Sequence, residues 1–328
     1  MRSVPRLIRS KAGTSVTTYI IRRILLSVPI MLAVFTLVFL LVRVAPGDPA
    51  VAALGDYASQ EAVEALRERM GLNEPIWAQY GHSLYAFIRG DLGSSLITNE
   101  PVARQVGTAL PYTLELTLVG IIFGTLLGIP TGILTALRRN RVADYIGRTF
   151  SLIGLSVPAF YMGVLLMIAF SLKLKLFPTV GGGDITNIVS NLRYLFLPAL
   201  TLGIIMMAYI TRMTRSSFLN VLQEDYVRTA RAKGLTERVV LYGHVLRNAL
   251  IPIASVIGVY SIVLIGDSVM TEVVFSRPGL GKLMVGAMKQ RDYATLQSVM
   301  LIYAVFVVLI NLITDISYAF IDPRIRYT

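Results

Sequence analysis

The chain contains no cysteine and only two histidines, His82 and His244, among its 328 residues. The absence of cysteine excludes a disulfide framework, thiolate metal sites and cysteine nucleophiles. Charged residues make up only 15% of the chain, whereas soluble domains carry about 25%. Together with 55% hydrophobic residues and a mean hydropathy of +0.66, this scarcity of charge excludes a soluble enzyme, a disordered chain and a fibrous protein. The composition therefore predicts a membrane protein.

Six uncharged and predominantly apolar runs are each long enough to cross a bilayer as a helix. A helix satisfies its own backbone hydrogen bonds in hydrocarbon, and about 20 apolar residues cross a core of roughly 30 Å. The runs contain 18 to 24 residues and predict an all-α protein with six transmembrane helices, at residues 24–42, 116–137, 149–172, 194–211, 248–266 and 293–314. An even number of spans places both termini on one side of the membrane.

Basic residues are distributed unequally between the two sides that these spans define. The two termini and the loops 138–148 and 212–247 carry 19 basic and 6 acidic residues, whereas the opposite loops carry 12 of each. An excess of lysine and arginine marks the cytoplasmic side of membrane proteins. We therefore expect both termini in the cytoplasm and the long loop 43–113 outside. The net charge of +12 is then explained by the basic cytoplasmic loops and termini, and we expect no nucleic-acid partner.

The N-terminal region is predicted to be a basic cytoplasmic tail, residues 1–19, followed by a retained helix. A signal peptide is the alternative, because Arg22 and Arg23 precede the first apolar run and an Ala-Val-Ala sequence follows it at 50–52. The apolar run of 19 residues exceeds the roughly 7 to 15 residues of a signal peptide. Its length favours a transmembrane helix.

One segment of the external loop is expected to fold as an amphipathic helix. The sequence QEAVEALRERM at 60–70 places its apolar residues on one helical face, with Ser59 as a possible N-cap and Gly71 as a possible C-terminal stop. Packing on the rest of the protein is the simplest role for this helix. Contact with the membrane or with an external partner stays open.

The cytoplasmic loop 212–247 contains a second helical segment, which begins at Glu224 and Asp225 and ends at Gly234. Acidic residues at its start and basic residues near its end suit the helix dipole. The segment is too polar to enter the bilayer, so we expect a short helix presented to the cytoplasm. By composition alone, it is a solvated surface helix.

Four glycines in the second span recur at a spacing of four residues, at Gly120, Gly124, Gly128 and Gly132. This spacing places them on one helix face, where the missing side chains let another helix approach closely. The simplest interpretation is a packing seam, within the chain or between subunits, and a substrate channel is the alternative. Pro130 is expected to kink the same helix.

The sequence lacks the groups that ion coupling or ATP hydrolysis requires. Ion-coupled transporters place ionisable residues inside their spans, whereas the nearest charged residues here stand at the ends of the uncharged runs, at Glu115, Arg212, Asp267 and Asp315. This argues most strongly against a proton relay. The segment RPGLGKL at 277–283 resembles a phosphate-binding loop only faintly, because that motif needs Gly at 276 and Ser or Thr at 283, where this chain has Ser276 and Leu283. We therefore expect no ATP site and no cofactor in this chain.

Two hydrolase interpretations also fail on residue content. The sequence GGGD at 181–184 matches the G-x-G-D string of intramembrane aspartyl proteases, but such enzymes need two carboxylates at membrane depth. A serine hydrolase would need a G-x-S-x-G motif and a suitably placed histidine, which the sequence lacks. We therefore expect a non-catalytic membrane subunit, without a metal site, that another protein powers.

Several separated segments carry a recognisable pattern. The most distinctive are EDYVRTARAKGL at 224–235 and HVLRNALIPI at 244–253. Others, in order, are APGDP at 45–49, GDLGSS at 90–95, PYTLEL at 111–116, RMTRSS at 212–217, FSRPGLGKL at 275–283 and DPRIR at 322–326. Together they resemble the permease subunits of binding-protein-dependent ABC importers, in the dipeptide and oligopeptide branch, over nearly the whole chain from about residue 20.

The resemblance implies a fold, a mechanism and a set of partners. The fold is that of a type I ABC importer permease over residues 20–328. The implied partners are a second, homologous permease subunit, two ATPase subunits that bind ATP and magnesium, and an extracytoplasmic binding protein that delivers the substrate. The resemblance also implies alternating access in the inner membrane of a bacterium, driven by the ATPase subunits.

The resemblance further assigns the helix in loop 212–247 as a coupling helix that docks on an ATPase subunit. The family's Glu-Ala-Ala...Gly motif maps onto Ala230, Arg231, Ala232 and Gly234, and its acidic first position is not kept in this chain. The expected docking residues are Asp225, Tyr226, Arg228, Thr229, Ala230, Arg231, Ala232, Lys233, Gly234 and Leu235. The residues that line the substrate path are not identified by the sequence.

The resemblance favours di- or oligopeptides as the transported substrate. Permeases of this branch also carry nickel chelates, glutathione, opines or sugars on similar scaffolds, so these solutes are the alternatives. An ion-coupled secondary transporter is the rival from a different class. Such a transporter would accumulate substrate without any ATPase.

Overall fold

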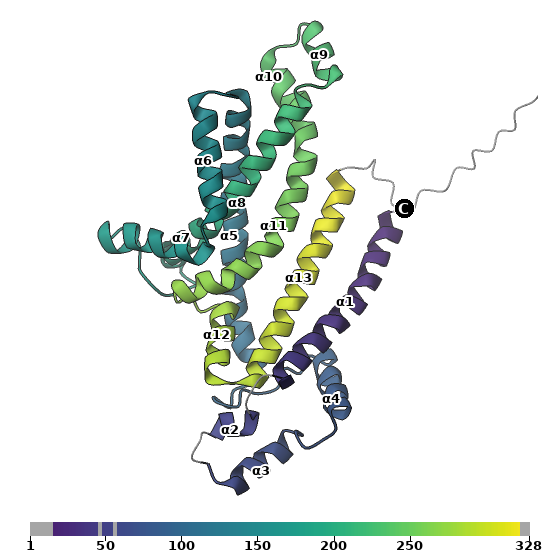
Figure 1. Ribbon diagram of the computed structural model, residues 1–328, viewed down its shortest axis with the longest axis vertical. Helices are drawn as coiled ribbons and strands as arrows, with labels where there is room; N and C mark the ends of the chain where they lie inside the picture. Colours follow the sequence, from purple (N-terminus) through teal and green to yellow (C-terminus); the bar gives the residue numbers. More distant parts are fainter. Residues whose placement is uncertain (1–15, 45–47, 55–57, 322–328) are drawn as a thin grey trace, which may run out of the picture.

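Helices make up nearly all of the regular structure in the computed structural model, which describes residues 16–44, 48–54 and 58–321. Most of the expected basic tail, the DPRIR ending and the first three residues of the APGDP segment lie outside these ranges. Within them no β-strand forms, and Ser94 and Pro101 make only an isolated bridge. The described chain is all-α, as its composition predicts (Figure 1).

Five helices in the described residues are long and apolar enough to cross a membrane, and a bent pair forms a sixth candidate span. The long helices run roughly along the long axis of the molecule (Figure 1). They are α1 (Val16–Val44), α5 (Val102–Leu137), α8 (Ile188–Val221), α11 (Arg247–Val274) and α13 (Tyr293–Ile321). The first residue of α1 and the last residue of α13 point toward the same end of the molecule (Figure 1).

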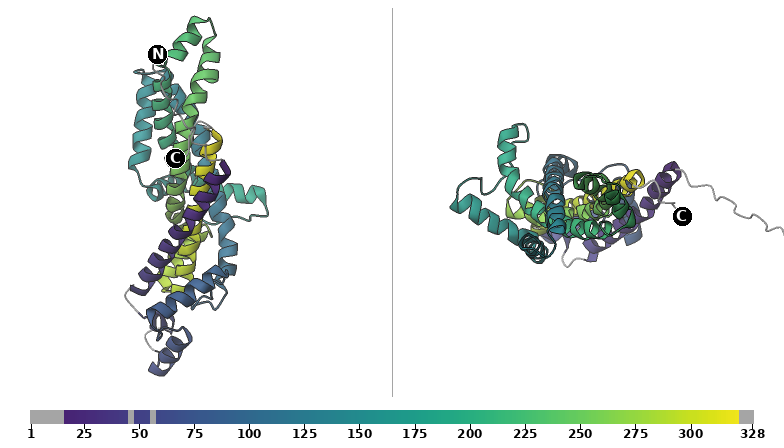
Figure 2. Two further views of the ribbon diagram at one scale, coloured as in Figure 1. Left: turned by 90° about the vertical axis from the view of Figure 1, so that its right-hand side faces the viewer. Right: turned by 90° about the horizontal axis from the view of Figure 1, so that it is seen from above.

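The third predicted span, 149–172, is not one straight helix. α6 (Val142–Ser156) meets α7 (Ala159–Leu166), which continues as the π-helical turn η1 (Met167–Lys173), at an angle of 110°. Pro158 precedes α7 and has no N–H group to continue the hydrogen-bond ladder of α6, so the helix breaks there. α7 therefore projects sideways from the bundle (Figures 1 and 2).

The long helices extend beyond their uncharged runs and carry charged side chains within them. Glu115 lies inside α5, Arg215 inside α8, and Asp267 and Glu272 inside α11. All four charges still lie outside the uncharged runs 116–137, 194–211 and 248–266. Buried charges are tolerated in a helix when other groups compensate them. The Glu272 carboxylate, for example, accepts a hydrogen bond of 2.6 Å from the Thr113 hydroxyl.

The centre of the bundle is the long contact between α5 and α8, and the four regularly spaced glycines of α5 lie along it. A Cβ atom added at Gly124 would lie 2.4 Å from the Cβ of Met206, and one added at Gly132 would lie 2.4 Å from the Cβ of Thr214. Both distances are shorter than any ordinary van der Waals contact. The absence of side chains therefore sets the spacing of these two helices, and the seam lies within the chain.

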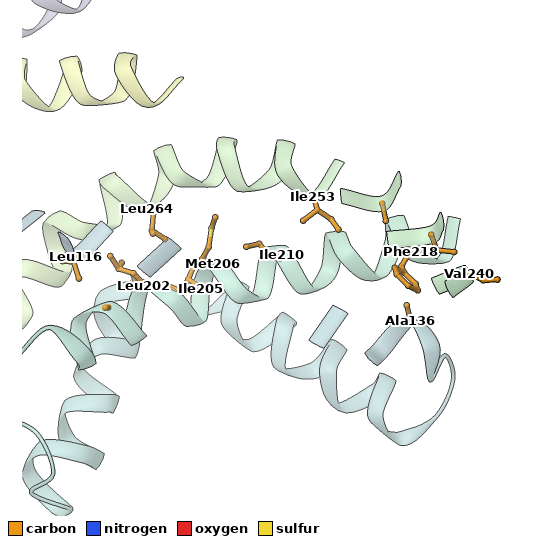
Figure 3. Close-up of a cluster of buried hydrophobic side chains, with 14 of the residues drawn as sticks. Leu116, Ala136, Leu202, Ile205, Met206, Ile210, Phe218, Val240, Ile253 and Leu264 are labelled. Atoms are coloured by element: carbon orange, nitrogen blue, oxygen red, sulfur yellow. The ribbon is translucent and has the colours of Figure 1, made fainter. Parts of the chain in front are cut away.

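The main hydrophobic core extends from this seam toward α11. Met206 and Ile210 of α8 are fully buried. They pack against Gly124 and Gly128 of α5, and Ile253 and Leu264 of α11 approach the same cluster (Figure 3). α8 is thus enclosed by α5 and α11, and it is the most deeply buried of the candidate spans. A displacement of α8 would be passed on to both neighbours.

Short helices cover both ends of the bundle (Figure 1). At one end, which we call the α9 end, lie α9 (Asp225–Ala232), α10 (Glu237–Val239) and the π-helical turn η2 (Val240–Leu246). At the opposite end lie α2 (Pro49–Leu54), α3 (Gln60–Arg69), α4 (Ile76–Ile88) and α12 (Leu280–Gln290). The helix expected at 60–70 is α3. The Ser59 hydroxyl accepts a hydrogen bond from the Ala62 N–H, and Gly71 has a φ of +64°.

Candidate functional site

α9 is a short helix with well-defined ends, presented at the tip of the molecule (Figure 1). Asp225 lies in its first turn and Arg231 in its last turn, so both charges complement the helix dipole. Gly234 follows with a φ of +77°, a left-handed conformation that costs a residue with a Cβ atom about 1 to 2 kcal/mol. The acidic start and the glycine after the helix thus mark the boundaries that the sequence predicts.

Only one face of α9 packs on the rest of the chain. Val227 is 0% exposed and Ala230 is 6% exposed, and both belong to the main hydrophobic core together with residues of α8 and η2. On the other face, the side chains of Asp225 and Arg228 are 95% and 71% exposed. The helix is therefore seated on the bundle and still offers a polar, charged surface to a partner.

Polar contacts brace α9 against the elements that follow it. The Arg231 guanidinium makes a bidentate pair with the Glu237 carboxylate of α10, at 2.7 and 3.2 Å. The Asn248 amide of α11 donates a hydrogen bond of 2.9 Å to the Tyr226 hydroxyl. A planar guanidinium held at two points restricts orientation as well as distance. α9 is therefore tied to α10 and α11 as well as to α8.

Nine of the ten expected docking residues are exposed in α9 and the turn after it. Ala230 is the exception, because its side chain faces the core and cannot touch a partner. Val227 is the other inward residue of α9 and is not among the expected docking residues. The signal was present, since Val227 and Ala230 are three residues apart and such a pair shares one helix face.

A buried ion pair joins α6 to α8 in the half of the bundle nearer α9. Asp144 is 0% exposed. Its carboxylate accepts hydrogen bonds of 2.7 and 2.9 Å from the Arg215 guanidinium and one of 2.9 Å from the Asn140 N–H. These three bonds compensate a charge that would otherwise be costly to bury. No local pattern indicates this pair, because its members are 71 positions apart along the chain.

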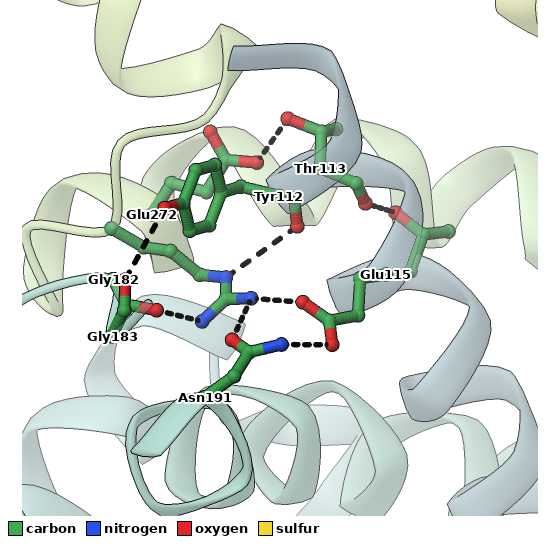
Figure 4. A network of polar contacts seen from close by, with 9 residues as sticks. Tyr112, Thr113, Glu115, Gly182, Gly183, Asn191 and Glu272 are labelled. Atoms are coloured by element: carbon green, nitrogen blue, oxygen red, sulfur yellow. Dashed lines mark hydrogen bonds and ion pairs between the residues drawn. The ribbon is translucent and has the colours of Figure 1, made fainter. Parts of the chain in front are cut away.

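At the opposite end of the bundle, the fully buried Arg277 organises a polar network (Figure 4). Its guanidinium donates to Glu115 at 2.5 Å, to the Gly182 carbonyl at 3.2 Å and to Asn191 at 3.4 Å. Asn191 in turn donates to the other oxygen of Glu115 at 2.5 Å. Burial lowers the pKa of the Arg277 guanidinium, and the Glu115 charge opposes that shift. The network ties α5, α8, the glycine-rich loop before α8 and the turn after α11 together.

Glu272 holds the beginning of α12 beside this network. One of its oxygens accepts from Thr113, and the other accepts from the backbone N–H groups of Gly281 and Lys282 at 2.7 and 3.2 Å. A carboxylate at these N–H groups satisfies a helix N-terminus and suits its dipole. A Cβ atom on Gly279 would lie 2.4 Å from this carboxylate. The glycines of the RPGLGKL segment therefore serve a close approach and a helix start.

The aspartate of the GGGD string lies in an exposed local turn. The hydroxyl and the backbone N–H of Thr186 donate to the Asp184 carboxylate at 2.7 and 2.9 Å, and they hold the pKa of Asp184 below its ordinary value. A turn of this kind accounts for Asp184 without any catalytic role. Among the described residues, no group of three or more histidine, aspartate or glutamate side chains is arranged to hold a metal ion.

Two family models match the sequence along most of its length. Residues 128–327 match the binding-protein-dependent transport system inner membrane component family. Residues 16–117 match the N-terminal family of the membrane components of such systems.

Curated relatives match nearly the whole chain. The dipeptide transport system permease protein DppB of Alkalihalophilus pseudofirmus is 39% identical over 330 residues, which cover 94% of this chain and 99% of the relative. The glutathione transport system permease protein GsiC of Escherichia coli K12 is 40% identical over 309 residues, with the same coverage.

Solved structures show the same fold at lower sequence identity. A chain of the MetNI methionine ABC transporter in an inward-facing conformation aligns with a TM-score of 0.55 and 20% identity, covering 66% of this chain and 96% of that one. A chain of an amino acid ABC transporter with histidines aligns with a TM-score of 0.52 and 16% identity, covering 66% and 93%.

Proposed function

Because the chain belongs to the family of inner membrane components of binding-protein-dependent transport systems, we propose that it is the permease subunit of an ATP-driven peptide importer. It forms half of the translocation pathway and catalyses no covalent change. The observation that carries the proposal is α9, a braced helix whose outer face is free within the described chain. ATP binding and hydrolysis then belong to partner subunits, which also hold the nucleotide and its magnesium ion.

Displacement of α9 reaches the spans through the residues that pack α9 on the bundle. Val227 and Ala230 lock the helix to the core, and the Arg231–Glu237 pair joins it to the segment that leads into α11. A partner that displaces α9 therefore moves α8 and α11 together. α5 follows α8 because the glycine seam leaves no space between them. Packed helices rearrange between discrete states rather than deforming continuously. Alternate opening to the two sides of the membrane is the consequence.

The proposed assembly contains one further permease subunit, homologous to this chain, together with two ATPase subunits and an extracytoplasmic binding protein. The excess of basic residues on the α9 side supports a cytoplasmic location for α9 and both termini. α2, α3, α4 and α12 then face the binding protein side. The expected docking surface is the exposed set Asp225, Tyr226, Arg228, Thr229, Arg231, Ala232, Lys233, Gly234 and Leu235.

Di- or oligopeptides are the proposed substrates. One relative is named for dipeptide transport and another for glutathione transport. Glutathione is itself a modified tripeptide, so the two names share a chemistry of short chains with free amino and carboxyl groups. Uptake of a labelled dipeptide into proteoliposomes that contain the complete transporter and its binding protein tests this choice. Uptake of glutathione alone would replace the peptide assignment, and uptake driven by an ion gradient without ATP would refute the ATP-driven mechanism.

Docking through α9 can be tested with a single introduced cysteine, because the chain contains none. We expect Arg228→Cys to crosslink to an ATPase subunit that carries one cysteine in its docking groove. Glu61→Cys on α3 is the matched control, since Glu61 is also exposed but lies at the opposite end of the molecule. A crosslink from position 61, or none from position 228 in an assembled transporter, would contradict the docking role.

A further inference from the structure

α4 presents an uncharged face with exposed aromatic and aliphatic side chains. Its thirteen residues include no lysine, arginine, aspartate or glutamate. Trp77, Tyr85 and Ile88 are 74%, 56% and 73% exposed. They recur at intervals of eight and three residues, with the open position Gly81 between them, so they share one side of the helix. An exposed apolar face of this kind marks a site of contact with a membrane or with another protein.

The opposite face of α4 packs on the outer part of α1. The Tyr80 ring stands edge-on to the Phe39 ring at 5.4 Å, and the Phe87 ring lies 5.6 Å from the Phe35 ring. The Tyr80 hydroxyl also lies 2.8 Å from the hydroxyl of Thr36. These α1 residues belong to the uncharged run 24–42. α4 is therefore held alongside a membrane-spanning segment and does not stand away from the bilayer.

A polar contact fixes the level of α4 relative to the end of that segment. Arg43 is the first charged residue after the uncharged run, and its Nε donates a hydrogen bond of 2.9 Å to Gln79 near the start of α4. Arg89 follows the helix directly, with its guanidinium 4.2 Å from the centre of the Tyr85 ring. Long basic side chains beside a membrane keep their stems in apolar surroundings while the charged group reaches the polar layer.

The surface of α4 is continuous with the surface of α1 that the bilayer covers. Leu37, Leu40 and Leu41 of α1 are exposed in the same stretch of the span. An apolar groove of about 390 Å³ also runs between α1, α4 and α13, and α4 contributes Leu84, Phe87 and Ile88 to it. The only lining side chain with a polar atom is Ser27. Lipid that covers α1 therefore also reaches the end of α4.

We propose that α4 is a helix at the membrane interface of one leaflet, with its exposed face in contact with lipid. Its start lies at the level of Arg43 in the headgroup region, and its end reaches along α1 toward the acyl chains. Trp77 and Tyr85 occupy the interface, as such side chains do in the aromatic belts of membrane proteins, and Ile88 points toward the acyl chains. An uncharged segment of this length is too short to span and suits an interfacial position. By the proposed orientation this is the outer leaflet. α4 would then fix the height of α2 and α3 above the membrane, where the binding protein arrives.

The single tryptophan of the chain gives a direct test, because Trp77 is the only one. The fluorescence emission of Trp77 is obtained by subtracting the spectrum of the Trp77→Phe variant from that of the wild-type transporter, both reconstituted in lipid vesicles. We expect a blue-shifted emission that phospholipids brominated on their acyl chains quench more strongly than aqueous iodide does. Ala65→Trp in the Trp77→Phe background is the control, because Ala65 is exposed on α3. At position 65 iodide should be the stronger quencher.

Two results would overturn the interfacial helix. Quenching of Trp77 by iodide to the same extent as at position 65 would place α4 in water. Protection of Trp77 from both quenchers would show that a protein surface covers it instead. Tyr85→Trp in the Trp77→Phe background gives an independent second probe on the same face and should follow Trp77. Because the quenching measurement needs no transport, its result is independent of the proposed substrate and of the proposed coupling to ATP hydrolysis.

Discussion

Replacing Gly124 with alanine adds one methyl group at one of the two tightest points of the contact between α5 and α8. The new Cβ atom would lie 2.4 Å from the Cβ and 2.5 Å from the Cγ of Met206, and 3.1 Å from the backbone nitrogen of Met207. Rotation of the Met206 side chain cannot relieve this clash, because a Cβ atom is fixed by the backbone. α8 itself must move away from α5.

The size of the effect follows from two opposing contributions. Overpacking a close-packed interior costs about 1 to 3 kcal/mol, and a clash against a fixed Cβ atom and a neighbouring backbone places Gly124→Ala near the upper value. Alanine favours the helix over glycine by about 1 kcal/mol. We therefore expect a net loss of stability of about 2 kcal/mol, together with reduced uptake because α8 no longer moves in register with α5.

The assay is the thermal unfolding midpoint of the purified transporter in detergent, followed by uptake in proteoliposomes. Gly107→Ala is the matched control, because Gly107 lies in the same helix and an added Cβ atom there meets nothing within 4 Å. Gly120→Ala should give an intermediate loss, since its nearest contact, Leu202 Cβ, is at 3.0 Å. Gly124→Ala that is as stable as Gly107→Ala would refute the close approach of the two helices.

Two further substitutions test the buried charges. Asp144→Asn should lower the free energy of unfolding by about 3 kcal/mol, and with it the thermal midpoint, because the Arg215 charge loses its carboxylate partner. Joint replacement of both residues by leucine should recover part of this loss. An unchanged midpoint for Asp144→Asn would contradict the ion pair. Arg277→Gln should release the glycine-rich loop before α8, because the guanidinium that joins the Gly182 carbonyl of this loop to Glu115 of α5 is then lost. Limited proteolysis of the loop in proteoliposomes should become faster. Proteolysis at the wild-type rate would show that Arg277 does not hold the loop.

The sequence predicts the spans well because hydrocarbon demands uncharged runs of a fixed length. It predicts α9 for a different reason, since Asp225 and Gly234 mark helix ends through local chemistry. Pro158 indicates the break between α6 and α7, but no charged residue interrupts the run 149–172 there, so the sequence predicts a single span. Ala230 was expected on the outer face of α9 and lies in the core. Which face of a short helix is buried depends on neighbours that local patterns do not reveal.

The Arg277 network could not be predicted from the sequence, although Glu115 and Arg277 lie in motifs that carry the family resemblance. Its side-chain partners Glu115 and Asn191 are 162 and 86 positions away along the chain. Charges at the ends of apolar runs are read as solvated groups unless the fold shows what pairs with them. In this network Arg277 is a fully buried structural element that pairs with the partly exposed Glu115. Long-range pairing of this kind depends on the packing of α5, α8 and the turn after α11.

The most direct test of the account is the ratio of peptide uptake to ATP hydrolysis when Gly234 is changed. Gly234 has a φ of +77° and open space around it, so a β-branched side chain disturbs only the backbone that fixes the end of α9. In a transporter that still assembles, Gly234→Val should lower uptake per ATP hydrolysed, whereas Gly234→Asn, which tolerates this conformation, should stay close to the wild type. A wild-type ratio for Gly234→Val would contradict the claim that α9 transmits the motion of the ATPase subunits to the spans.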